Sequence, residues 1–283
     1  MRHNFSVTVG PRTFRLGSDW RPPVAALESL YSAYPEPADA IPDFSVRLEA
    51  TNPMRQLIRP QVAIRGDYVL PDAVPVSLVH GLIAAEMAMN LQMALGERRF
   101  LLLHASSVER DGKAIIMTGE SGSGKSTLSA LLGSRGWRFL GDEFALVDPV
   151  TGLVHPFPRP VSLKNEAIAE MQRLCPKAQF GPLMAGTPKG DLRHMVPDAA
   201  AIAAMNEPAP PALILFPRFG HEAATRDVGA SEVFVRLTQA STNYVALGEA
   251  GFDALTRLVT GVPAKAIDYP DTKTAIRLVE ALW

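Results

Sequence analysis

The chain has 283 residues, of which 47% are hydrophobic and 20% charged, and its formal net charge is −1. This composition supports a substantial core and argues against disorder, and the near-neutral charge argues against general attraction to nucleic acid. The single cysteine, Cys175, cannot form an intrachain disulfide and favours a reducing compartment. We therefore expect a cytoplasmic protein of one large or two modest domains, without a nucleic-acid partner.

The first 75 residues are the more β-rich part of the sequence. Alternating polar and apolar residues predict strands at residues 5–9 and 44–48. Gly66 and Asp67 lie between two short apolar runs, a pattern that predicts a hairpin turn. We therefore expect residues 1–75 to form a small β-rich region of their own.

Residues 76–95 predict a long helix that opens the second expected region, residues 76–283. The helix is largely apolar but is interrupted by four polar residues, His80, Glu86, Asn90 and Gln92. This pattern indicates a buried or amphipathic helix and argues against a membrane span. The N-terminus has no apolar run typical of a secretion signal. We accordingly expect no membrane partner.

The most informative stretch is GESGSGKST, residues 119–127, which follows an apolar β-prone run and precedes a helix-prone one. It matches the P-loop (Walker A) pattern G-x-x-x-x-G-K-[ST] in the strand–loop–helix context that the pattern requires. Glycines let successive backbone N–H groups face phosphate oxygens, and the helix N-terminus adds a positive dipole end. The predicted nucleotide-binding residues are Gly119, Glu120, Ser121, Gly122, Ser123, Gly124, Lys125, Ser126 and Thr127.

The rest of the chain alternates between strand and helix patterns, which indicates an α/β protein with a mixed sheet. Residues 137–140 and 233–237 predict strands, and residues 272–282 predict an amphipathic helix. Residues 176–197 are rich in glycine, proline and lysine and predict a mobile loop. Lys189, Arg193 and His194 would lie in that loop, where they could close over a ligand.

Asp142 and Glu143 directly follow the strand predicted at residues 137–140. Residues at the carboxyl ends of strands in an open α/β sheet converge on the ligand crevice. One carboxylate can hold Mg²⁺, and the other can accept a proton from an attacking hydroxyl. Lys125 would place a positive charge on the β- and γ-phosphates, and the Ser126 hydroxyl can ligate the Mg²⁺.

Residues 101–143, from LLLHASSVE to RFLGDE, resemble the catalytic domain of the HPr kinase/phosphorylase family. They are more closely similar to the HPr kinase-related proteins that accompany peptide-modification gene clusters. The stretch RPVSLKN, residues 159–165, also resembles this subgroup. The matching positions are His104, the loop 119–127, Arg135, Gly136, Asp142 and Glu143. The resemblance implies a P-loop catalytic domain of the HPr kinase/PEP carboxykinase type, with a mixed sheet, behind the β-rich region.

The activity that this resemblance implies is transfer of the γ-phosphate of ATP (or GTP), with Mg²⁺, to a serine hydroxyl of a protein or peptide. Asp142 would match the catalytic acid/base with His104 close to it, and Ser126 and Glu143 would match positions near the metal. The candidates for further phosphate or substrate contacts are Arg159, Lys164 and Arg193. A neighbouring gene is the expected source of the acceptor, and an oligomer is compatible with the family, because HPr kinases are hexameric.

The sequence departs from the HPr kinase pattern in two places. Thr127 stands where HPr kinases usually have glutamate, and the downstream family signature is missing, so the phosphorylase half-reaction and HPr itself as acceptor stay open.

Two alternatives to the serine kinase stay open as well. The chain could be a nucleotide-binding switch or NTPase without an acceptor, although it lacks the signature of transporter-type ATPases. It could also be a small-molecule kinase, but about a hundred residues precede its loop. Our hypothesis is that residues 1–75 dock the acceptor.

Overall fold

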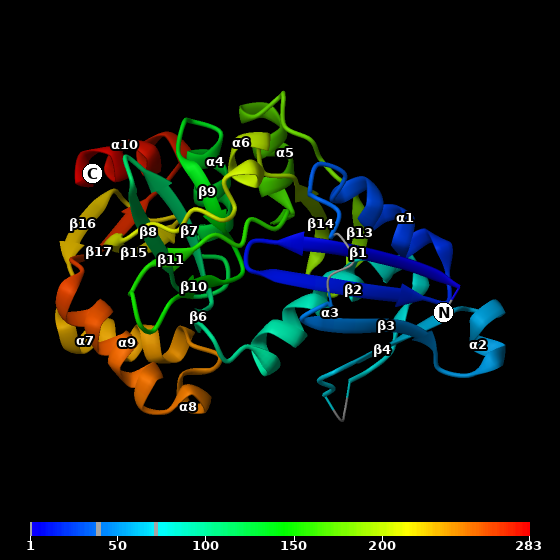
Figure 1. Cartoon of the computed structure of the whole chain (residues 1–283). Helices are drawn as coiled ribbons and strands as arrows, with labels where there is room; N and C mark the ends of the chain where they lie inside the picture. Colours follow the sequence, from blue (N-terminus) through cyan, green and yellow to red (C-terminus); the bar gives the residue numbers. More distant parts are fainter. Residues whose placement is uncertain (1, 38–40, 71–72) are drawn as a thin grey trace.

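The computed structural model of the chain describes residues 2–37, 41–70 and 73–283. These residues form a mixed α/β protein with one five-stranded, one six-stranded and two three-stranded β-sheets. The five-stranded sheet carries the N-terminus at one end of the molecule, and the C-terminal helix lies at the opposite end (Figure 1). The fold class predicted from the alternation of strand and helix patterns is thus confirmed at the level of a mixed α/β protein.

The five-stranded N-terminal sheet has the strand order β1-β2-β3-β4-β5. Its strands are β1 (His3–Val9), β2 (Arg12–Ser18), β3 (Phe44–Ala50), β4 (Gln61–Gly66) and β5 (Val76–Ser77). The strands predicted at residues 5–9 and 44–48 are therefore confirmed as β1 and β3. Its helices are α1 (Arg21–Leu30), α2 (Pro53–Leu57) and α3 (Gly81–Gly96), the last preceded by the single turn η1 (Leu78–His80).

Helix α3 belongs to the core of this N-terminal part. Together with η1 it is long and apolar enough to cross a membrane by length and composition, but half of its most apolar window is buried inside the protein. Ala85, Met89 and Met93 are completely buried in one cluster with residues of the N-terminal strands. This burial is what the sequence pattern predicted for the helix. Strand β5 begins at Val76 and pairs with β4, so the boundary expected after residue 75 falls inside one sheet. The division of the chain into two domains stays a prediction.

The hairpin predicted at Gly66 and Asp67 is wrong. Strand β4 pairs with β3 and with β5, and no strand follows directly after Asp67 within the described residues. Instead, the side chain of Gln92 on α3 accepts a hydrogen bond from Tyr68 N–H and donates one to the Tyr68 carbonyl, each 2.9 Å long. Because these groups are satisfied by a buried amide, the segment needs no partner strand.

The six-stranded central sheet has the order β16-β17-β15-β8-β7-β9. Its strands are β7 (Ala105–Arg110), β8 (Lys113–Thr118), β9 (Arg138–Gly141), β15 (Pro211–Phe219), β16 (Ala224–Asp227) and β17 (Ala264–Tyr269). Strand β15 is parallel to both β8 and β17, whereas β7 is antiparallel to both β8 and β9. Consequently β8 and β9 point in the same direction, with β7 between them.

Both faces of the central sheet are buried, as the period-two alternation of β8 illustrates. Ile115 and Met117 face one cluster with α4 and α10, while Ala114 and Ile116 face another with α7 and α9. These helices and their neighbours are α4 (Lys125–Gly133), α5 (Glu166–Leu174), α6 (Ala199–Ala203), α7 (Ala230–Ala240), α8 (Tyr244–Leu247), α9 (Glu249–Gly261) and α10 (Thr272–Leu282). Burial on both faces explains why the central strands read as short apolar runs.

The strand predicted at residues 233–237 is wrong, because these residues belong to helix α7. Val233 and Leu237 are four positions apart and both are buried, which is the helical spacing of a core-facing stripe. The helix predicted at residues 272–282 is confirmed as α10, and the strand predicted at residues 137–140 corresponds to β9.

The mobile loop predicted at residues 176–197 is also wrong. It contains a hairpin that pairs with the strand after Pro160, giving a three-stranded sheet of β12 (Val161–Lys164), β14 (Gly190–Met195) and β13 (Met184–Thr187). The turn closes at Gly190, which has φ +86°, and a Cβ there would lie 2.2 Å from Asn165 Oδ1. The glycine- and lysine-containing segment that the sequence predicts to be mobile is therefore the tight turn between β13 and β14.

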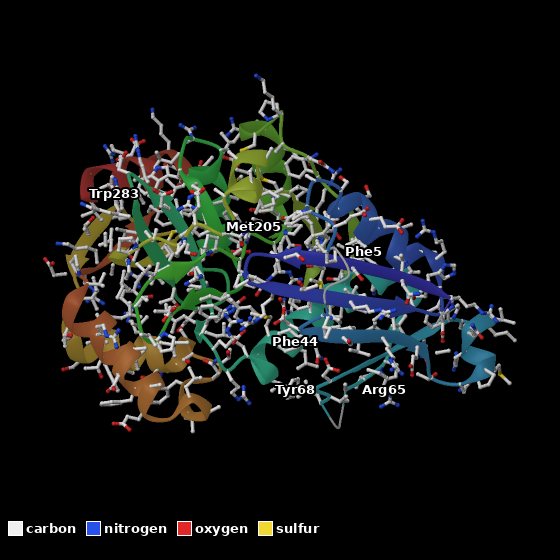
Figure 2. All side chains as sticks on the ribbon, in the orientation of Figure 1. Phe5, Phe44, Arg65, Tyr68, Met205 and Trp283 are labelled. Carbon is white, nitrogen blue, oxygen red and sulfur yellow. The ribbon has the colours of Figure 1, made fainter. Side chains whose placement is uncertain are left out.

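The N-terminal sheet is in direct contact with the rest of the protein. The Gly10 N–H in the β1–β2 turn donates to Met205 Sδ at 3.3 Å, and Figure 2 shows Met205 above the inner end of this hairpin. A Cβ at Gly10 would lie 2.1 Å from the Pro156 carbonyl oxygen, so only glycine fits this approach. Pro156 follows β11 (Val154–His155), which forms the other small sheet with β10 (Ala145–Val147) and β6 (Leu101–Leu103).

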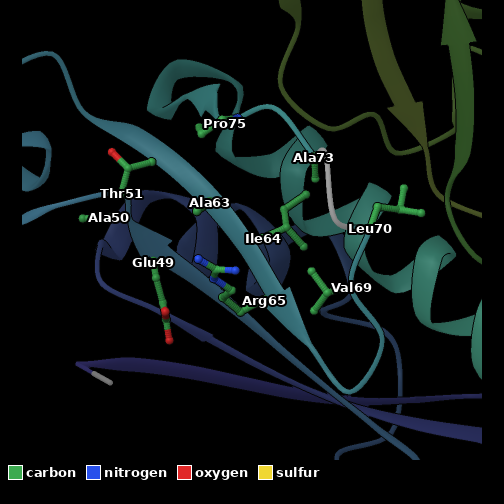
Figure 3. Close-up of a pocket in the computed structure, with 10 residues that line it drawn as sticks. All are labelled: Glu49, Ala50, Thr51, Ala63, Ile64, Arg65, Val69, Leu70, Ala73 and Pro75. Carbon is green, nitrogen blue, oxygen red and sulfur yellow. The ribbon is translucent and has the colours of Figure 1, made fainter.

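Two surface pockets lie on the N-terminal sheet. One, of about 210 Å³, lies between β3, β4 and the segment leading back to α3, with Ile64 and Leu70 in its lining (Figure 3). The other, of about 360 Å³, lies between the edge strand β1 and the segment that follows α1. Among the residues described, none that the sequence predicts for the site lines either pocket; the predicted loop and acidic pair lie at strand ends of the central sheet.

Candidate functional site

A glycine-rich loop, residues 119–124, connects the end of β8 to the start of α4. Gly122 and Gly124 have φ values of +86° and +93°, which residues with a side chain rarely adopt. Gly124 is the N-cap of α4, and no side chain caps the helix. The N–H groups of the first helical turn therefore have no side-chain acceptor and carry the positive end of the helix dipole. Such a helix N-terminus is a favourable place for an anion such as phosphate.

Lys125 brings a positive charge to the same loop. Its Nζ donates to the carbonyl oxygens of Gly119 and Glu120 at 2.6 and 3.0 Å, and only 7% of the residue is exposed. Burial lowers the pKa of Lys125, while the negative charges of Asp142 and Glu143 act to raise it. The positive charge of Lys164 lowers this pKa further, so Lys164 on β12 lies within electrostatic range of the loop.

Asp142 is the buried carboxylate of the site, with 6% of the residue exposed. Ser106 Oγ on β7 donates to Asp142 Oδ1 at 2.7 Å. Burial, together with the charge of Glu143, raises the pKa of Asp142 to about 6, against hydrogen bonds from the Ser106 and Ser126 hydroxyls and the charge of Lys125. A buried carboxylate with a raised pKa at the strand end next to a glycine-rich loop is a candidate for general-base chemistry.

The antiparallel strand β7 explains how distant residues meet here. Ala105, its first residue, is paired with Thr118 at the end of β8, and Ser107 is paired with Gly141 at the end of β9. The N-terminal end of β7 thus lies at the same sheet edge as the C-terminal ends of β8 and β9. Sequence reasoning missed Ser106, because its contact with Asp142 depends on this register, which no sequence pattern reveals.

His104 and Glu143 form the exposed rim of the site. His104 Nδ1 lies 3.2 Å from the Glu143 carbonyl oxygen and 3.7 Å from Glu143 Oε2. About half of the His104 side chain and a third of the Glu143 side chain are exposed. The His104 carbonyl accepts a hydrogen bond from Thr118 Oγ1 at 3.1 Å, which holds it beside the end of β8. The structure therefore brings His104 next to the acidic pair.

Arg159 and Arg193, two of the three predicted cationic contacts, have partners elsewhere in the protein. The guanidinium of Arg159 is buried, and each of its three nitrogens donates inside the protein, to Tyr31 Oη, to Asn90 Oδ1 and to Glu86. Arg193 donates from Nε to the Gly181 carbonyl at 2.7 Å and stacks over Phe180. Both arginines thus have partners inside the protein, and a role of Arg159, Arg193 or Lys164 at a bound phosphate stays a prediction.

The donor set of the site fits a Mg²⁺ ion that arrives with a nucleotide. Among the residues described, no group of three or more His, Cys, Asp or Glu side chains is placed to hold a metal ion. The Glu143 carboxylate and the Ser126 hydroxyl nevertheless supply hard oxygen donors next to the loop. Mg²⁺ usually takes one or two carboxylates, and phosphate oxygens and water complete its shell. These residues thus suit a metal that is shared with bound phosphates.

The fold and site define a mixed α/β protein with a glycine-rich loop after β8 and a carboxylate pair after β9, at the same edge of the sheet. A family model described as "SynChlorMet cassette protein ScmC" matches residues 79–175, about a third of the chain. The search of curated proteins gave no match. The solved structure of the Hpr(Ser) kinase/phosphatase from Coxiella burnetii is similar, with 15% identity and a TM-score of 0.29 over 64% of this chain and 92% of that one.

Proposed function

We propose that the protein is an ATP-dependent kinase that transfers the γ-phosphate to a serine hydroxyl of a protein or peptide. The observation that carries this proposal is the buried Asp142 carboxylate, which accepts a hydrogen bond from Ser106 Oγ at the sheet edge where the glycine-rich loop begins. The choice of a serine acceptor rests on the sequence resemblance described above.

In the proposed step, Asp142 accepts the proton of the acceptor hydroxyl as the hydroxyl oxygen forms a bond to the γ-phosphorus. The bond from the γ-phosphorus to the β–γ bridging oxygen breaks, and its electron pair leaves with ADP. Lys125 and Lys164 offset the negative charge that spreads over the transferred group. Mg²⁺, held by Ser126 and Glu143 when bound with ATP, would neutralise charge on the β- and γ-phosphates.

Transfer to candidate acceptors tests this proposal directly. The matching family model is that of a cassette protein, so we choose peptides and small proteins encoded beside the gene and incubate them with γ-labelled ATP. We expect one of them to become labelled on serine. ATP hydrolysis without a labelled acceptor would contradict the kinase and favour the nucleotide switch, and label on a small metabolite instead would favour a small-molecule kinase.

Replacing Lys125 by alanine should lower the transfer rate about 10²–10³-fold, because it removes the buried positive charge that we propose offsets the charge of the transferred group. Affinity for ATP should fall as well, which isothermal titration measures. Lys113→Ala is the matched control, since Lys113 is exposed at the opposite end of β8. Equal activity of the Lys125 and Lys113 variants would contradict the assignment of the loop.

The transfer rate should depend on pH through Asp142. The base must be ionised, and the raised pKa of Asp142 places its ionisation near pH 6. We expect kcat/KM, which reports the free enzyme, to be constant above about pH 7 and to fall about tenfold for each pH unit well below 6. ATP affinity measured over the same range serves as the control. A rate that stays flat from about pH 5 to 8 would exclude Asp142 as the base.

A further inference from the structure

The side of the glycine-rich loop that faces away from Asp142 carries an exposed aromatic residue. Phe219 is the last residue of β15, the strand next to β8 on the side opposite β7. Its N–H donates to the Ser123 carbonyl of the loop at 3.2 Å. Tyr269 at the end of β17 also donates from its hydroxyl to the Ser123 carbonyl, at 3.3 Å. The outer wall of the loop is thus fixed to these two residues.

The two aromatic rings differ in exposure, and this difference suggests separate roles. Tyr269 is 2% exposed, whereas Phe219 is 51% exposed, and their ring centroids are 5.9 Å apart. A Cβ at Gly124 would lie 2.4 Å from Tyr269 Oη and 3.3 Å from Phe219 Cβ, so the rings adjoin the residue that begins α4. Tyr269 acts as a buried support, and Phe219 keeps part of its ring surface free beside the loop.

The order of strands fixes which end of a nucleotide would meet Phe219. Asp142 and His104 lie on the β7 and β9 side of β8, where the proposed transfer occurs. A triphosphate with its γ-phosphate on that side has its α-phosphate, ribose and base on the opposite side of the loop. That side is the edge formed by the ends of β15 and β17, where the exposed ring of Phe219 lies.

We propose that Phe219 is the stacking surface for the base of the bound nucleoside triphosphate, an inference that rests on the proposed function. Every base has an apolar face that stacks on an aromatic ring, so such a surface tolerates adenine and guanine alike. The neighbouring Arg218 and Asp268 are paired with each other at 2.5 and 2.9 Å, which occupies their charged groups. The structure therefore assigns base affinity to Phe219 and little discrimination between ATP and GTP.

The test compares ligands with and without a base. Binding of ATP, GTP and inorganic triphosphate, each with Mg²⁺, is measured by isothermal titration for the wild type and for Phe219→Leu and Phe219→Trp. Leucine keeps an apolar contact with Tyr269 but removes the aromatic face, and tryptophan retains it. We expect Phe219→Leu to weaken ATP and GTP about tenfold, with triphosphate affinity unchanged and Phe219→Trp close to wild type.

The controls separate failure of this inference from failure of the proposed function. Phe252→Leu changes an aromatic side chain of similar exposure (47%) on α9 and should leave all affinities unchanged. Unchanged ATP affinity in Phe219→Leu would overturn the stacking role while leaving nucleotide binding intact. Equal weakening of ATP and triphosphate would overturn it too, because the loop itself would then have been disturbed. A wild-type protein that binds none of the three ligands would overturn both proposals.

Discussion

Replacing Asp142 by asparagine should lower the rate of phosphoryl transfer about 10²–10⁴-fold, the usual contribution of a positioned general base. The amide has nearly the shape of the carboxylate, and its oxygen can still accept the hydrogen bond that Ser106 Oγ donates. It cannot accept a proton from the acceptor hydroxyl. Single-turnover transfer from labelled ATP measures the loss, and titration with ATP should give an affinity close to that of the wild type.

Asp111→Asn is the matched control for this substitution. Asp111 lies in the turn between β7 and β8, its side chain is 79% exposed, and its φ of +54° is one that asparagine adopts readily. We expect this variant to transfer phosphate at the wild-type rate. Full activity of Asp142→Asn would exclude the base, and a parallel loss of ATP affinity would point to a metal or binding role instead.

Asp142→Asn should also raise the stability of the folded protein, because the pKa of Asp142 is higher in the folded than in the unfolded state. Asp142 titrates at about 6 in the folded protein and near its ordinary value of 3.8 when unfolded, so the folded state holds the proton more tightly. Its ionisation therefore lowers the stability of the fold as the pH rises from about 4 to 6, and the loss reaches about 3 kcal/mol above pH 6. Asp142→Asn lacks this effect and should melt at a higher temperature at about pH 7.5. The difference should shrink as the pH falls from about 6 to 4.

The sequence predicted those parts of the site that depend on local pattern. The strand, glycine-rich loop and helix around Lys125 follow from a motif and from periodicity, and Asp142 follows from its position after an apolar run. His104 was expected at this edge only through the family resemblance. The strand pairing explains the position of His104. Strand β7 is antiparallel to β8 and its first residue, Ala105, pairs with Thr118, so His104 lies beside the end of β8.

What the sequence did not predict depends on contacts between distant segments. The amide of Gln92 satisfies the backbone of Tyr68 and replaces the expected hairpin partner. Arg159 follows β11 and was expected at a phosphate, yet its charge is paired with Glu86 on α3. Local composition does not reveal such partners. Gln92 and Tyr68 are 24 positions apart in the sequence, and Arg159 and Glu86 are 73 positions apart.

The pair of Arg159 and Glu86 leads to the largest stability effect that we expect. Both side chains are at least 90% buried, and they share Tyr31, which donates to Glu86 Oε1 at 2.9 Å and accepts from Arg159 Nε at 3.2 Å. Replacing Arg159 by methionine leaves the Glu86 carboxylate buried without its cation. Such a loss destabilises proteins by about 3–5 kcal/mol. We expect the melting temperature to fall by roughly 10 °C.

An exposed ion pair and a double variant make this prediction specific. Arg226 pairs with Glu232 at 2.6 Å, but both side chains are more than a third exposed, so Arg226→Met should leave the melting temperature close to that of the wild type. The double variant Arg159→Met, Glu86→Leu removes both charges and should be more stable than Arg159→Met alone. A double variant that is no more stable than the single one would mean that packing around Arg159, and not the unpaired charge, sets the loss.

This network also determines how the acceptor-docking hypothesis can be tested. Tyr31 and Tyr34 come from the N-terminal region, and Tyr34 donates from its hydroxyl to the Pro158 carbonyl next to Arg159. Deleting residues 1–70 would remove both tyrosines and expose Glu86 and Arg159, so we expect the truncated chain to unfold. Docking should therefore be tested in the full chain, with substitutions on the surface of the N-terminal sheet. A truncated chain that folds and binds ATP with wild-type affinity would contradict the structural role of this network.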